Sequence, residues 1–108
     1  MSSKFEDALA VLYEKEGWTV LRNGWPDFLC VRKRQEGGFD LMGVEVKAKG
    51  DKLRANQKLN LAALSLVMPV YEVQEGGGYG GPSENFTLPD GRRACVLIFD
   101  KDFEGVNL

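Results

Sequence analysis

Two charged side chains, Glu45 and Lys47, interrupt a run of apolar, β-branched residues at a spacing of two. In a strand this spacing places both charged side chains on one face, while Val44 and Val46 point to the other face. An unpaired charge in an apolar setting costs several kcal/mol at least, so the chain must pair these groups, expose them or use them on a metal. The run therefore predicts a strand with one apolar face and one face that carries chemistry.

A Pro-Asp pair upstream supplies a third ionisable group. Pro26 biases Trp25 to extended geometry, which makes Asp27 the first residue of a strand that ends near residue 34. Two glycines then turn the chain back toward Glu45, so a hairpin would bring the two carboxylates within reach of one cation. With the backbone carbonyl of Val46 and waters, they would suit Mg²⁺. Each feature taken alone has an equally good structural explanation. Asp27 could cap a turn, and Glu45 and Lys47 could be an exposed ion pair on the strand.

The pattern of apolar and turn residues predicts a single α/β domain over residues 1–108, in the order α-β-β-β-α-β-β. A central mixed sheet of about five strands would be flanked by helices, with residues 39–48 and 70–74 parallel and joined by a right-handed crossover. Residues 75–91 are rich in glycine and turn formers and predict a flexible surface loop. The expected helices are residues 4–16 and 53–67, and the expected strands are residues 18–22, 28–34, 39–48, 70–74 and 94–99.

The chain contains no histidine and two cysteines. This composition excludes Ser-His-Asp and Cys-His catalysis and makes a zinc site of the usual kind very improbable. Cys30 and Cys95 lie in separate apolar segments and are expected to be reduced core thiols. An enzyme with this composition would work with carboxylates, lysine and a hard metal.

The charges are unevenly spread along the chain. The net charge is -2, yet residues 32–58 hold eight basic and four acidic residues. A basic middle on an acidic body is typical of a localised phosphate-binding surface, although solubilising surface charge is the simpler alternative. The basic residues expected to contact DNA phosphates are Lys49, Lys52, Arg54 and Lys58. The absence of an apolar run near 20 residues, and of a secretory signal, predicts a cytoplasmic protein with no membrane segment.

Four features occur in an order that resembles the PD-(D/E)XK nucleases: Glu6 in a first helix, Gly24 to Asp27, Glu45-Val46-Lys47, and Gln57 in the following helix. The chain is most similar to the stand-alone VRR-NUC and Holliday-junction-resolvase-like branch, over Glu6 to about Val73. The resemblance implies a restriction-endonuclease-like fold.

The same resemblance implies a role for each matching residue. Asp27 and Glu45 would bind Mg²⁺ or Mn²⁺, Lys47 would assist the attacking water, and Glu6 would add a further acidic group that could also reach the metal. Gln57 would support the site. Glu6 also completes a capping box with Ser3, so a purely structural role stays open for it, as does a solvated helix position for Gln57.

By this resemblance the chain would be a metal-dependent DNA endonuclease. Structure-specific cleavage of branched DNA such as a Holliday junction is favoured, by a homodimer acting in DNA repair, recombination or phage DNA processing. The source would be viral or prokaryotic. The alternatives are a non-catalytic nucleic-acid-binding module that retains the fold, and an adaptor whose basic region binds an acidic partner.

Overall fold

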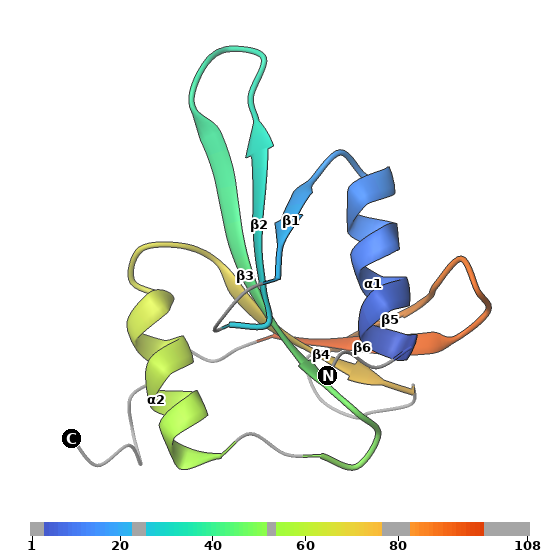
Figure 1. The fold of residues 1–108 in the computed structure, drawn as a ribbon. Coiled ribbons are helices and arrows are strands. Elements are labelled where there is room, and N and C mark those ends of the chain that lie inside the picture. Colours follow the sequence, from blue (N-terminus) through green and yellow to red (C-terminus); the bar gives the residue numbers. More distant parts are fainter. Residues whose placement is uncertain (1–3, 23–25, 52–53, 77–82, 99–108) are drawn as a thin grey trace.

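The computed structural model describes residues 4–22, 26–51, 54–76 and 83–98, which form a six-stranded mixed sheet flanked by two helices (Figure 1). The strand order across the sheet is β1-β2-β3-β4-β6-β5. The elements are α1 (Lys4–Lys15), β1 (Thr19–Leu21), β2 (Phe28–Lys33), β3 (Phe39–Lys47), α2 (Ala55–Leu64), β4 (Val70–Glu75), β5 (Ser83–Thr87) and β6 (Arg93–Ile98).

The predicted α/β class and most of the predicted elements are confirmed. β2 and β3 form the expected antiparallel hairpin, and β3 pairs with β4 in parallel through the α2 crossover. α2 is shorter than predicted, because the chain leaves the helix at Ser65 and passes through a turn before Pro69. Ser3, the predicted capping partner of Glu6, lies outside the described residues, and so do Trp25 and Leu53.

The predicted loop over residues 75–91 contains a strand that the sequence did not indicate. β5 pairs antiparallel with β6, with Phe86 opposite Ala94. Phe86 packs against the core, and this anchors a segment whose other residues are polar. Residues 77–82 of the predicted loop lie outside the described part of the chain.

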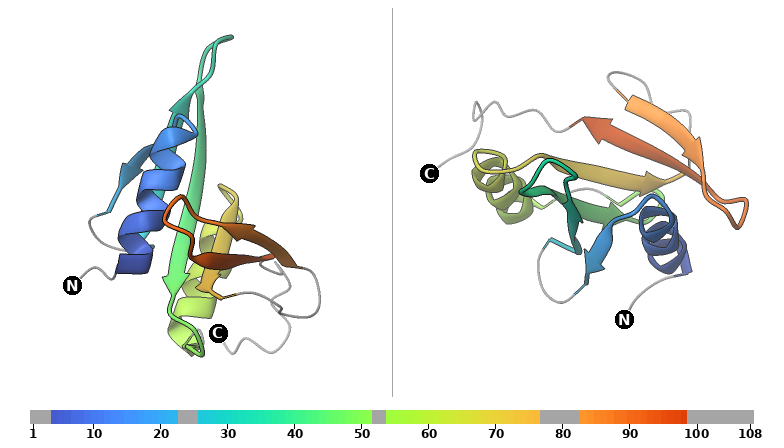
Figure 2. Two further views of the ribbon diagram at one scale, coloured as in Figure 1. Left: turned by 90° about the vertical axis from the view of Figure 1, so that its right-hand side faces the viewer. Right: turned by 90° about the horizontal axis from the view of Figure 1, so that it is seen from above.

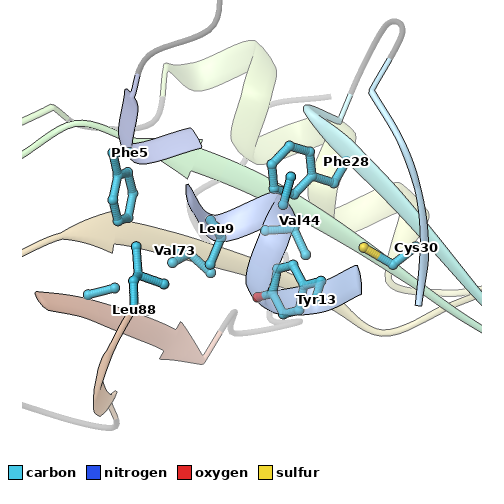
Figure 3. Close-up of a cluster of buried hydrophobic side chains, with 10 residues drawn as sticks. Phe5, Leu9, Tyr13, Phe28, Cys30, Val44, Val73 and Leu88 are labelled. Atoms are coloured by element: carbon cyan, nitrogen blue, oxygen red, sulfur yellow. The ribbon is translucent and has the colours of Figure 1, made fainter. Parts of the chain in front are cut away.

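One hydrophobic core joins α1 to a single face of the sheet (Figure 3). Phe5, Leu9 and Tyr13 of α1 belong to one buried cluster with Phe28 and Val44, all with 9% exposure or less. Cys30 and Cys95 are both buried and form no disulfide, as predicted. Because side chains alternate along a strand, burying Val44 on this face sends Glu45 to the opposite face, where α2 lies.

Gly43 lies where both Pro26 and β4 approach β3 closely. A Cβ atom there would come within 3.1 Å of the Pro26 ring and 3.2 Å of a Val70 methyl group. Its amide donates a 2.9 Å hydrogen bond to the Pro69 carbonyl, where β4 joins β3. The absence of a side chain at position 43 thus lets the Pro26-Asp27 segment and β4 approach β3 closely.

The β2–β3 hairpin projects beyond the rest of the sheet (Figures 1 and 2). β4 pairs with β3 only from Gly43 onward, so residues 39–42 are paired on the β2 side alone. No helix among the described residues is long and apolar enough to cross a membrane.

Candidate active site

Asp27 lies directly before β2, at the end of the β2–β3 hairpin opposite its turn. Its Oδ2 accepts a 2.8 Å hydrogen bond from the backbone N–H of Val46. Since the N–H and C=O of one strand residue point toward the same neighbour, the Val46 carbonyl faces the side on which Asp27 lies. The structure therefore places the Asp27 carboxylate and the Val46 backbone side by side.

Glu45 is a buried carboxylate with an unsatisfied oxygen. The residue is 3% exposed, and its Oε1 lies 3.7 Å from Lys47 Nζ. Its Oε2 is buried without a hydrogen-bond partner among the described residues. Burial, and then the neighbouring charge of Asp27, raise the pKa of Glu45 to about 7. Once the carboxyl is ionised, this buried oxygen accepts from no donor, which suits it to a cation.

Gln57 links the two charged groups of β3 to α2. Its Oε1 accepts a 3.0 Å hydrogen bond from Lys47 Nζ and a 2.9 Å bond from the backbone N–H of Arg54. Its Nε2 donates a longer bond, 3.4 Å, to Glu45 Oε1. The side-chain amide therefore orients the Lys47 ammonium while it anchors the first turn of α2, so it is not a solvated helix residue.

Replacing Gln57 with alanine should lower the rate of any reaction at this site by roughly tenfold or more, because Lys47 loses its orienting acceptor. The free energy of unfolding should fall by only about 1 kcal/mol with the lost hydrogen bonds. Asn60→Ala, an exposed change on the same helix, is the matched control. Equal rates for the two variants would contradict a positioning role for Gln57.

Glu6 lies in the first turn of α1 and is engaged by Arg22, whose Nη2 is 3.6 Å from its carboxylate. Arg22 also pairs with Asp7 at 2.7 Å and lies over the Phe28 ring. Burial, with the charge of Asp27 as the second cause, raises the pKa of Glu6. The negative charge of Asp27 therefore acts on the Glu6 carboxylate. Sequence reasoning gave no indication of the arginine that holds it.

A cation at this site would have a limited set of protein ligands. Among the described residues, no three histidine, cysteine or acidic side chains form one metal-binding group. The groups that converge are the carboxylates of Asp27 and Glu45 with the Val46 carbonyl, a hard-oxygen set that fits Mg²⁺ or Mn²⁺ if waters complete it. Glu6 as a further metal ligand stays a prediction.

Two buried polar residues on β4 extend the site, and the sequence pattern did not indicate them. Glu72 lies opposite Glu45 in the parallel register, and Gln74 lies opposite Lys47. Gln74 Nε2 donates to Glu72 Oε1 at 2.6 Å and reaches the Asp51 carbonyl at 3.4 Å. The alternation in β4 predicts a polar face, but only the register shows that this face adjoins the site.

The predicted basic residues lie around the connection from β3 to α2. Lys49 follows the strand, while Arg54 and Lys58 lie at the start of the helix, all three exposed. Lys52 lies outside the described residues. The exposed cations therefore adjoin the Lys47 end of the site, where an anionic chain could lie across them.

Comparison with known proteins gives one match. The family model of the VRR-NUC domain matches residues 2–73, about two thirds of the chain. No curated protein sequence and no solved structure matches the chain. The matched range includes every charged group described above at the ends of β2 and β3, and it ends within β4.

Proposed function

Since the chain belongs to the VRR-NUC domain family, we propose that it is a metal-dependent endonuclease that hydrolyses DNA phosphodiester bonds at the site formed by Asp27, Glu45 and Lys47. The observation that carries the proposal is the buried Glu45 Oε2, which has no hydrogen-bond partner among the described residues. A carboxylate kept in this state costs stability unless its ligand compensates for the cost.

Each residue of the site has a role in this reaction. Asp27, Glu45 and the Val46 carbonyl would hold Mg²⁺ or Mn²⁺, and Glu6 would join them on release from Arg22. When bound, the cation would supply charge stabilisation at the phosphoryl oxygens and lower the pKa of a coordinated water. The Lys47 ammonium, fixed by Gln57, would orient the attacking water or neutralise charge on the phosphate.

The DNA backbone would lie along the exposed cations beside the site. Lys49, Arg54 and Lys58 would contact phosphates, joined by Lys52, and the N-terminal amides of α2 would add to this surface. Such contacts hold DNA through its backbone and carry no base sequence. The substrate would therefore be selected by shape, and we propose branched DNA such as a Holliday junction, cut by a homodimer in repair, recombination or phage DNA processing.

Cleavage assays on labelled linear duplex, single strands and four-way junctions test the proposal. The full chain should cut with Mg²⁺ or Mn²⁺ and be inert with EDTA, and Lys47→Ala should lower the rate by at least about a hundredfold. Lys15→Ala, an exposed change in the last turn of α1, should cut normally. DNA binding without metal-dependent cleavage would establish the alternative, a non-catalytic binding module. Equal cleavage rates on all three substrates would contradict the proposed preference for branched DNA.

Metal affinity should depend on pH through Glu45. Its pKa of about 7 means that the carboxyl is largely protonated below that pH, and the cation must then displace a proton. The apparent affinity for Mn²⁺ should fall about tenfold per pH unit below pH 7 and level off above it. Titration calorimetry at pH 6 and pH 8 measures this change. Equal affinities would show that Glu45 does not bind the metal.

A further inference from the structure

The projecting part of β3 presents an open strand edge. Gly43 directs its N–H toward β4, and the backbone groups of Phe39 and Leu41 face the same way because hydrogen-bonding direction alternates along a strand. No strand among the described residues pairs with this edge between positions 39 and 42. Proteins normally cover, charge or shorten such an edge, because it is a template for another strand.

The same edge is apolar and borders a hollow. Phe39 is 60% exposed and Leu41 is 41% exposed, and across the hollow Val67 is 76% exposed. These three residues, with Met68 and Pro69, line a cavity of about 450 Å³. Exposed apolar side chains gathered beside unpaired backbone favour a partner that binds as a strand, and they do not favour nucleic acid.

We infer that a second copy of this chain pairs with the Phe39–Met42 edge, strand to strand and antiparallel, so that two sheets join into one across a two-fold axis. An antiparallel pair of identical strands is itself two-fold symmetric, so one edge serves both copies. The inference rests on the homodimer of the proposed function and assigns its interface, and self-association can be measured without cleavage.

One register satisfies all the outward backbone groups of residues 39 to 41. With the axis at Asp40, Phe39 of each copy pairs with Leu41 of the other, which gives four backbone hydrogen bonds. Both cross-strand pairs are then aromatic with aliphatic, a combination that stabilises sheets. In this register Gly38 of one copy lies opposite Met42 of the other, next to Pro69, and a glycine there adds no side chain to the contact.

The charges on the other face agree with this register. Asp40 lies 2.7 Å from Arg34 and 3.5 Å from Arg32 within one copy. The hydrogen bond from Arg34 is the largest cause of a pKa of Asp40 below its ordinary value. The two Asp40 carboxylates that meet at the axis would thus be surrounded by four guanidinium groups, which offset their repulsion.

The other two sheet edges fit a partner less well. β1 offers three residues, and β5 places the exposed polar residues Glu84 and Asn85 at its centre.

Pairing through β3 also determines how far apart the two sites of the dimer lie. Glu45 lies five residues from the axis, so the two sites would face the same side about 33 Å apart along the strands. One turn of B-form DNA is about 34 Å.

Sedimentation equilibrium of the full chain tests the interface. The native chain should be a dimer, and Phe39→Asp should weaken the dimer by at least about a hundredfold, because two charges would enter apolar pairs. Val11→Asp makes the same type of change at an exposed position of α1 (45%) and should leave the dimer intact. A monomeric native chain, or equal effects of the two variants, would overturn the inference.

A cysteine at the axis gives a second, independent test. Directly opposite residues in a non-hydrogen-bonded antiparallel pair have Cα atoms about 4.5 Å apart, within disulfide range. Asp40→Cys should therefore form a covalent dimer under mild oxidation, since the native Cys30 and Cys95 are buried. Thr19→Cys on β1 is the control. Cross-linking no greater at position 40 than at position 19 would exclude this register.

Discussion

The Asp27→Asn variant is expected to lose DNA cleavage by at least about a thousandfold while it keeps its fold. Metal ions contribute several kcal/mol of transition-state stabilisation, which corresponds to this factor, and a neutral amide binds them poorly. The fold should survive because the asparagine carbonyl can accept the same hydrogen bond from Val46. Removing one negative charge beside Glu45 also relieves repulsion in the metal-free protein.

Single-turnover cleavage and urea unfolding, measured on the same preparations, separate the two effects of Asp27→Asn. Glu14→Gln removes the same charge from an exposed position of α1 and should change neither quantity appreciably. If Asp27→Asn unfolds at a far lower urea concentration, Asp27 is primarily structural and its place in the metal site is wrong.

The Glu45→Gln variant is expected to be more stable than the native chain in EDTA, but only at neutral to alkaline pH. Burial raises the pKa of Glu45 from 4.5 to about 7, so between these values the folded state holds a proton that the unfolded state has lost. Native stability therefore falls as pH rises through this window. Glutamine does not ionise, so its free energy of unfolding does not fall in this way. At pH 8 it should exceed that of the native chain by about 2–3 kcal/mol.

Unfolding free energies at pH 4 and pH 8 measure this advantage, which should nearly vanish at pH 4, below both pKa values. Glu84→Gln, an exposed change on β5, should show no such pH-dependent difference. Added Mg²⁺ should reverse the order at pH 8, because it stabilises only the protein that binds it. The same gap at both pH values would mean that Glu45 is not a costly buried charge.

The sequence predicted the elements of the fold well because their causes are local. Periodic apolar residues predicted α1 and the hairpin, and the Pro-Asp pair with the glycine turn predicted that Asp27 lies near the end of β3. β5 was missed because its residues form a strand only through pairing with β6 and burial of Phe86. Such pairing is a tertiary effect with little trace in local propensity.

The candidate site was predictable in its residue types and only partly in its contacts. Alternation alone indicates that Glu45 and Lys47 share a face. The positions of Glu72 and Gln74 opposite them depend on the register between β3 and β4, which no local pattern specifies. Likewise, the pairing of Glu6 with Arg22 joins residues on two elements whose packing the sequence does not reveal.

Gly43 has a consequence for mutational scanning and for the interpretation of related sequences. A methyl group at this position would press on Pro26 and Val70, the two neighbours that bring Asp27 and β4 to β3. An alanine there leaves every ionisable residue unchanged, yet Pro26 and Val70 must move by a few tenths of an ångström to make room for it. A sequence that keeps the complete acidic and lysine motif therefore does not by itself establish the geometry of the site, and the residue two positions before the glutamate is the one to inspect.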